Sequence, residues 1–128
     1  MSYILDTNIV IYYLQKQLPE KARIFVNNLL AKDIPYLSVI TEIELLCWKN
    51  DSEKDMEILK DFINGTRIID LENKIKLKTI EIRRNHKIKL PDAIIAATAI
   101  VEGFSLVTRN TADFQNISGI ILQNPWEQ

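Results

Sequence analysis

Tyr3-Ile4-Leu5-Asp6-Thr7-Asn8 is the stretch that decides the fold, because three apolar residues run directly into an acid and two polar residues. A short apolar run of this kind is typical of a buried strand, and Asp beside Thr and Asn is typical of the start of a helix. A strand that leads into a helix is the repeating unit of a parallel α/β sheet. Asp6 is therefore expected at the carboxyl edge of a sheet, where such folds bind ligands.

The rest of the chain continues this alternation of short apolar runs with segments of helical period. The runs predicted to be strands are 3–5, 36–39, 67–70, 105–108 and 120–122. Helices are predicted to begin near residue 8 and after residue 40, and to span 19–32, 53–64, 75–86 and 91–102. This order predicts an α/β fold in which helices cover a parallel sheet.

Composition sets the broad class of the protein. The chain of 128 residues, 47% hydrophobic and 26% charged, is typical of a single folded domain, predicted over 1–128. The net charge of −1 argues against a protein that grips nucleic acid through bulk charge alone. The three glycines lie apart, so no phosphate-binding glycine loop is expected.

The cysteine content and the length of the most apolar run predict the cellular compartment of the protein. The single cysteine, Cys47, has no internal disulfide partner and is expected to be a small buried hydrophobe in a reducing cytosol. The N-terminal residues show no signal peptide. The most apolar run, 93–101, is about half the length needed to cross a bilayer. A cytoplasmic protein without membrane contact is predicted.

Further acids occupy positions like that of Asp6, near the start of a predicted helix: Glu44, Asp92 and Asp113. Each alone has an ordinary structural explanation, because carboxylates stabilise the first turn of a helix. Thr41 with Glu44, and Asn110 with Asp113, also have the spacing of a capping box. Around one crevice, however, two such charges ~4 Å apart would repel by about 4 kcal/mol at an effective dielectric near 20. A divalent cation would turn that repulsion into attraction.

The ligand types favour Mg²⁺, with Mn²⁺ as the alternative. The only histidine, His86, lies in a basic segment far from the acids, so a zinc site is not expected. Carboxylates, amides and water are the hard oxygen donors that Mg²⁺ and Mn²⁺ take. Hydrolysis would then use a metal-activated water. Polar neighbours are predicted to orient the ligands, unless they only form turns: Thr7, Asn8, Thr108 and Asn110.

Basic residues are unevenly distributed. Seven of the sixteen fall between Lys74 and Lys89. We interpret them mainly as the solvated face of a helix. An alternative is that Arg83, Arg84 and Lys87 border a groove for an anionic substrate.

Four motifs occur in order along the chain: Leu5-Asp6-Thr7-Asn8, Ser38-Val39-Ile40-Thr41-x-x-Glu44-Leu45, Leu90-Pro91-Asp92-Ala93-x-x-Ala96 and Thr108-x-Asn110-x-x-Asp113-Phe114. Together they resemble the PIN domain family, and more narrowly its short VapC-type toxins, from Tyr3 to the C-terminus. The resemblance implies a parallel five-stranded sheet with helices on both faces and an acidic pocket for Mg²⁺ or Mn²⁺. It also implies endonucleolytic cleavage of RNA, a homodimer, and neutralisation by a small antitoxin in a groove beside the pocket.

The resemblance also assigns residues. Asp6, Glu44 and Asp92 match the family's three core acids and Asp113 matches the fourth, so these four are the predicted catalytic residues. Of these, the predicted metal ligands are Asp6, Asp92 and Asp113. Glu44 is preferred to Glu42 because it keeps the family's three-residue offset from the preceding threonine.

Two other functions compete with a metal-dependent ribonuclease toxin. A phosphotransfer domain would use an Asp at a strand end, but it expects a second early acid and a late lysine where this chain has Arg109. A catalytically silent PIN-like module would bind RNA or protein without cutting. The presence of all four acids argues against the silent module, and the dependence of RNA cleavage on Asp92 would separate the two.

Overall fold

A five-stranded sheet forms the centre of the protein. The computed structural model describes residues 2–49 and 52–128. Each strand pairs in parallel with its neighbours, in the order β3-β2-β1-β4-β5. The strands are β1 (Tyr3–Leu5), β2 (Tyr36–Ser38), β3 (Arg67–Ile69), β4 (Ser105–Val107) and β5 (Leu122–Gln123). The predicted parallel five-stranded sheet is confirmed.

Helices make the connections between these strands. They are α1 (Thr7–Leu14), α2 (Glu20–Lys32), α3 (Val39–Cys47), α4 (Glu53–Asn64), α5 (Asn73–Asn85), α6 (Leu90–Glu102) and α7 (Thr111–Phe114), with a final 3₁₀ helix, η1 (Pro125–Glu127). The predicted helices are found, most with ends shifted by one or two residues, and α4 has the predicted bounds. Among the residues described, no helix is long and apolar enough to cross a bilayer.

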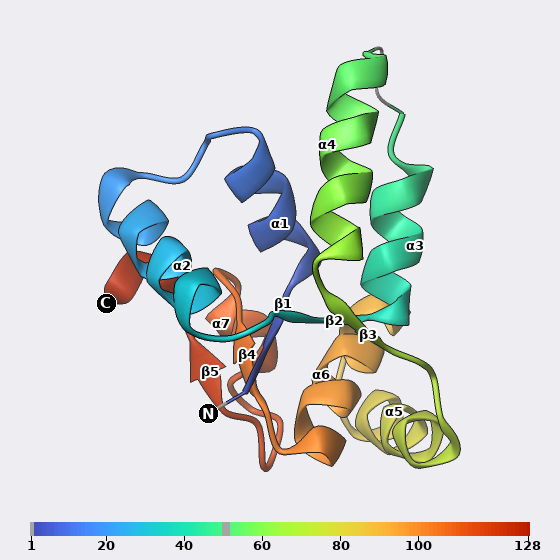
Figure 1. Cartoon of the computed structure of the whole chain (residues 1–128). Coiled ribbons are helices and arrows are strands. Elements are labelled where there is room, and N and C mark those ends of the chain that lie inside the picture. Colours follow the sequence, from blue (N-terminus) through green and yellow to red (C-terminus); the bar gives the residue numbers. More distant parts are fainter. Residues whose placement is uncertain (1, 50–51) are drawn as a thin grey trace.

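The sheet separates two apolar cores. Successive strand residues point to opposite faces, so Tyr3 and Leu5 pack with α1, α2 and α4, whereas Ile4 packs with α5 and α6. Figure 1 shows α1 and α4 on one side of the strands and α5 and α6 on the other. The expectation of helices on both faces is confirmed, and the two layers hold the strand ends in fixed positions.

Four of the five strands have ends that differ from the prediction: β2, β3 and β4 each end one residue earlier, and β5 is shifted. Hydrogen bonds explain the difference for β5 and β2. The last strand is Leu122–Gln123 rather than 120–122. It takes a polar residue because the Gln123 amide donates to the Ser105 hydroxyl of β4 at 2.9 Å. The second strand ends at Ser38, one residue early. The Ser38 hydroxyl accepts from the Ile40 N–H at 3.2 Å and so begins α3.

The strand order creates a switch point at the carboxyl edge of the sheet. From β1 the chain moves to β2 and β3 on one side, and later returns to β4 on the other side. The carboxyl ends of β1 and β4 are therefore neighbours whose connections leave in opposite directions. This is the place where open α/β sheets leave a crevice for ligands.

Candidate functional site

Asp6 lies at the switch point between β1 and β4. Its backbone N–H donates to the Val107 carbonyl at 3.0 Å, which extends the pairing of the two strands by one residue. Its carboxylate caps α1, with one oxygen accepting from the Thr7 N–H at 2.8 Å. The other oxygen accepts from the Thr108 hydroxyl, also at 2.8 Å. The side chain is only 4% exposed, so these two bonds replace most of its hydration.

Thr108 joins Asp6 to the loop that carries Asn110. The Thr108 hydroxyl accepts from the Asn110 N–H at 3.0 Å while it donates to Asp6. Asn110 precedes α7, but its side chain makes no capping bond there, so the predicted capping box with Asp113 is wrong. The side chains of Asn110 and Asp113 both line the larger of the two cavities described below.

A chain of hydroxyl groups reaches Glu44 on α3. The Thr7 hydroxyl donates to the Glu44 carboxylate at 2.9 Å and lies 3.0 Å from the Thr41 hydroxyl. Because Thr7 has one proton to give, Thr41 donates to Thr7. The predicted capping box of Thr41 with Glu44 is wrong, since Ser38 begins α3 and Thr41 is buried within it. Glu44 is instead oriented from α1.

The acids meet around two adjoining cavities. The first, about 390 Å³, has the following lining: Asn8, Glu44, Lys87, Ile88, Lys89, Pro91, Asp92, Asn110 and Asp113. The second, about 310 Å³, is lined by Asp6, Thr7, Asn8, Ile11, Glu44, Cys47, Trp48 and Asp92. Asn8, Glu44 and Asp92 belong to both. Seven of the eight residues singled out in the sequence line these cavities, and the eighth, Thr108, is buried and donates to Asp6.

Burial and mutual repulsion make ionisation of two acids unfavourable. Desolvation raises the pKa of Asp6 to about 6, and the nearby charges of Asp92 and Glu44 act in the same direction. The hydrogen bonds from Thr108 and Thr7 oppose this rise. Desolvation also raises the pKa of Asp92, followed by repulsion from Glu44 and Asp113, whereas Lys89 lowers it. The site is therefore a concentration of negative charge that a cation would stabilise.

The geometry fits a divalent cation only with water as part of its shell. Among residues 2–49 and 52–128, no three His, Cys, Asp or Glu side chains are grouped so as to hold an ion directly. Both Asp6 oxygens are engaged in hydrogen bonds, and carboxylates without a cation between them repel. Mg²⁺ commonly keeps several waters and takes one or two carboxylates, so a spaced set of acids matches that ion.

Sequence reasoning did not place Lys89 or Trp48 beside the acids, and it named Lys87 only as the alternative border of a groove for an anionic substrate. Lys87 and Lys89 line the larger cavity, and Trp48 lines the smaller one. A lysine immediately before a helix is one signal that could have been noticed, since a cation is disfavoured there. Cys47, expected to be buried, is exposed and lines the smaller cavity, because it ends α3 on the side that faces away from the sheet core.

A parallel sheet with acids at the β1/β4 switch point is the architecture of a PIN domain, and the PIN domain model matches residues 3–120. The chain belongs to the PIN domain family. It is 34% identical to ribonuclease VapC2 of Rickettsia felis, an alignment that covers the whole of both chains.

Solved structures of the same group share the fold. The VapBC2 structure from Rickettsia felis, bound to a DNA fragment from its promoter, matches with a TM-score of 0.82 and 30% identity, over 97% of this chain and 98% of the other. A toxin–antitoxin complex from Klebsiella pneumoniae matches with a TM-score of 0.76 and 30% identity, over the same shares.

Proposed function

We propose that this protein is an endoribonuclease that acts in the cytoplasm as the toxin of a toxin–antitoxin pair and requires Mg²⁺ or Mn²⁺. The observation that carries the proposal is the gathering of Asp6, Glu44, Asp92 and Asp113 around two joined cavities at the switch point of the sheet. The ribonuclease VapC2 relative and the toxin–antitoxin complex support the substrate class and the biological role.

The proposed roles follow from the position of each side chain. Asp6, Asp92 and Asp113 would hold the cation, with water completing its shell. When bound, such an ion supplies the acidity that lets water attack at neutral pH and offsets charge on the phosphoryl oxygens. Glu44, held by Thr7 at 2.9 Å, lies on both cavities and is placed to accept a proton from the attacking water. Thr108 keeps Asp6 in one orientation.

Chelation of metal tests the proposed reaction. Purified protein should cut at least one RNA in a panel of tRNA and single-stranded RNA when Mg²⁺ or Mn²⁺ is present. EDTA should abolish cleavage and excess Mn²⁺ should restore it, as resolved on denaturing gels. Cleavage that persists in EDTA would contradict the metal requirement. A folded, metal-bound protein that cuts none of these RNAs would favour the catalytically silent module.

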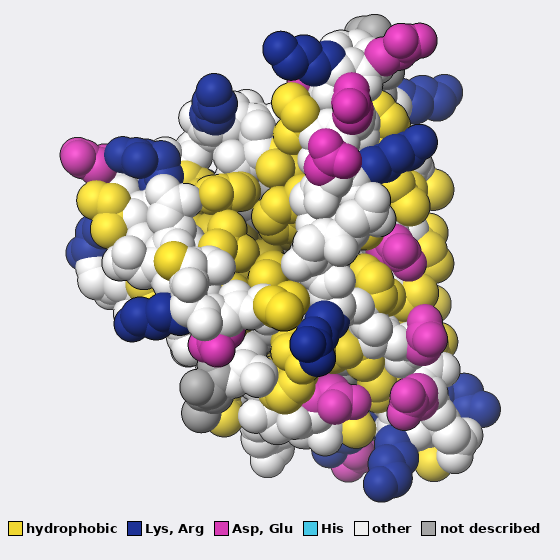
Figure 2. Space-filling view, in the orientation of Figure 1, with side chains coloured by type: hydrophobic (Ala, Val, Ile, Leu, Met, Phe, Trp, Pro, Cys, Tyr) yellow, Lys and Arg dark blue, Asp and Glu magenta, His cyan; other side chains and the backbone are white. Residues whose placement is uncertain are grey.

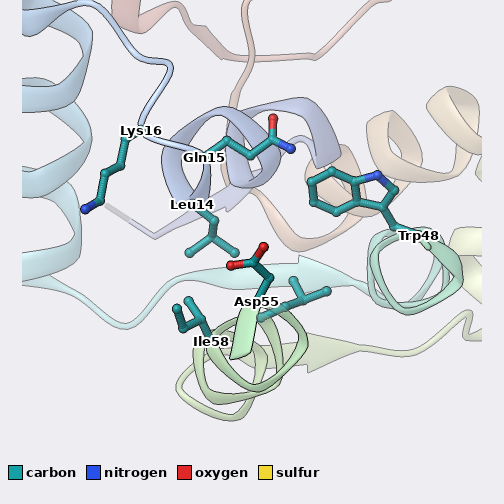
Figure 3. A pocket seen from close by; sticks show the side chains of 7 residues that line it. Leu14, Gln15, Lys16, Trp48, Asp55 and Ile58 are labelled. Atoms are coloured by element: carbon teal, nitrogen blue, oxygen red, sulfur yellow. The ribbon is translucent and has the colours of Figure 1, made fainter. Parts of the chain in front are cut away.

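A groove beside the acids is the proposed docking site of the antitoxin. Two cavities of about 410 and 590 Å³ share Leu14, Lys16 and Ile58 and lie between α1, α2 and α4. Figure 3 shows Leu14 at the end of α1 facing Ile58 of α4, with Trp48 to one side. Figure 2 shows hydrophobic side chains in the hollow between α2 and α4. Trp48 also lines the smaller acidic cavity, so a peptide in the groove would extend to the acids.

Ile58→Glu is expected to weaken the antitoxin complex. Ile58 is 44% exposed and lines both cavities of the groove. Docking of an apolar segment would desolvate the introduced carboxylate, which is unfavourable. Affinity for the cognate antitoxin should fall about tenfold, measured by calorimetry or by co-purification. Lys60→Glu, on an exposed part of α4 outside the groove, is the matched control. Equal affinity of all three proteins would place the antitoxin elsewhere.

Exposed apolar side chains on α3 and α5 support a homodimer. Ile43 and Leu46 on α3, and Leu77 and Ile80 on α5, are each more than 40% exposed. Figure 2 shows hydrophobic side chains along the outer side of α3. Sedimentation should give twice the monomer mass for the wild type, and Leu46→Glu should shift the population toward monomer. Wild type that sediments as a monomer at high concentration would exclude the dimer.

A further inference from the structure

Two lysines share the larger cavity with the acids. Lys87 and Lys89 lie in the segment between α5 and α6, and both side chains line the cavity formed with Glu44, Asp92 and Asp113. Ile88 between them is half-buried and packs on the core beneath α6. The alternation of an exposed, a packed and an exposed residue is that of extended chain, which puts both lysines on one side. Ile88 thus anchors the pair.

Neither lysine is explained by the stability of the fold. Within the described residues the one ion pair is Lys78 with Glu81, so neither Lys87 nor Lys89 has an acid within ion-pair distance. Lys89 occupies the N-cap of α6, where its side chain makes no capping bond. A cation at that end opposes the helix dipole, and Ser, Thr, Asp or Asn would be more stable there. Within the fold, Lys89 interacts with the Asp92 charge from beyond ion-pair distance, which lowers the pKa of Asp92, so both ammonium groups keep their hydrogen-bond donors free for a ligand.

We propose that Lys87 and Lys89 form a phosphate clamp that binds the RNA backbone next to the scissile bond. This inference rests on the proposed ribonuclease function and names the residues that hold its substrate. The catalytic cavity carries three carboxylates that repel a polyanion, and the chain as a whole has a net charge of −1. Beside the proposed divalent ion, the two lysines would add local positive charge that attracts the phosphodiester, and an ammonium group donates up to three hydrogen bonds to its oxygens.

Nucleic acid fits this clamp better than an acidic peptide does. The apolar groove proposed for the antitoxin has neither lysine in its lining, whereas both line the cavity proposed to hold the scissile phosphate. Each lysine–phosphate pair is also sequence-independent, since it reads charge and not bases. The clamp should therefore set the affinity for RNA and leave the choice of sequence to other surfaces.

Equilibrium binding tests the clamp without relying on cleavage. The parent for this experiment is Asp92→Asn, which removes the proposed reaction, and the probe is a fluorescein-labelled single-stranded RNA of about 12 nucleotides. Its anisotropy is followed over a salt series. Adding Lys87→Gln and Lys89→Gln should weaken binding about tenfold for each lysine at low salt. The slope of log affinity against log salt should become shallower by about 0.7 for each lysine replaced.

Two controls separate the clamp from a general loss of charge or of structure. Lys60→Gln with Lys76→Gln removes the same charge from exposed positions outside the cavity, and should change affinity by less than about twofold. Lys87→Arg with Lys89→Arg keeps the charge and should restore both affinity and slope. Thermal melts of all variants show whether each is folded.

The outcomes distinguish the clamp from the function on which it rests. Unchanged affinity and slope in the Gln variant, with a parent that binds RNA, would overturn the clamp and leave the ribonuclease proposal intact. Loss of antitoxin binding without loss of RNA binding would also overturn it. A parent that binds no RNA at any salt concentration would overturn the proposed function and the clamp together.

Discussion

Asp92→Asn should reduce RNA cleavage by roughly a thousandfold while leaving the protein folded. Asp92 lines both acidic cavities, and its neutral analogue would lose the charge that holds the proposed cation. Loss of about 4 kcal/mol of transition-state stabilisation corresponds to that factor. Initial rates on one cleavable RNA, with both proteins purified in parallel, give the comparison.

The fold should tolerate this change. Asp92 lies in the first turn of α6, where its charge favours the helix dipole by about 0.3–1 kcal/mol. Its pKa is raised by desolvation and then by Glu44 and Asp113, so neutralisation also relieves repulsion. Asp61→Asn, an exposed position on α4, is the matched control and should cleave at the wild-type rate. Equal activity of Asp92→Asn and wild type would remove Asp92 from the site.

Asp6→Asn should make the metal-free protein more stable by about 1–2 kcal/mol near pH 7.5. The folded protein raises the pKa of Asp6 from 3.8 to about 6, mainly by desolvation. Such a shift corresponds to a cost of at most about 3 kcal/mol for the ionised form. Asn keeps the capping bond to Thr7, but its NH2 group cannot accept from the Thr108 hydroxyl, which offsets about 1–2 kcal/mol of the gain. Thermal or urea unfolding in EDTA measures the difference.

The pH dependence identifies the cause. Between about pH 4 and 6 the folded protein retains a proton on Asp6 that the unfolded chain has lost, so the stability of the metal-free wild type should fall as pH rises through this window. Asp6→Asn should lack this component, whereas Asp61→Asn should retain it. Mg²⁺ or Mn²⁺ should stabilise wild type at pH 7.5 and Asp6→Asn much less. A less stable Asp6→Asn in EDTA would show that the carboxylate is structural.

The sequence predicted the sheet and the place of the acids because both depend on local pattern. The apolar runs that end just before Asp6 and near Thr108 were each predicted to be a strand followed by a helix. In a parallel sheet the carboxyl ends of such strands lie at the same edge. The order of the strands was not readable, since nothing local states that β4 lies beside β1. The hydrogen bond from Thr108 to Asp6 depends on that order. Asp6 was predicted as a metal ligand and Thr108 as a residue that orients ligands, but the bond between the two was not predicted.

The predictions that the structure corrects concern the side of a helix or loop on which a residue lies. Thr41 fits a capping motif by spacing, yet Ser38 offers an earlier hydroxyl and takes the cap, which leaves Thr41 to pack against Thr7. Cys47 is small and apolar, but the last turn of α3 turns it outward. The basic segment was interpreted mainly as a solvated helix face, with Lys87 as the alternative border of a groove, and only the packing of Ile88 assigns both Lys87 and Lys89 to the cavity.

The bond between Thr108 and Asp6 also has a consequence during synthesis. It joins positions 102 residues apart, so Asp6 leaves the ribosome long before the strand and hydroxyl that hold it. A chain that ends before β4 can pair β1 with β2 alone, and it lacks both the second partner of β1 and the loop that carries Asp113. We expect the nascent protein to be harmless to the RNA of the ribosome that makes it.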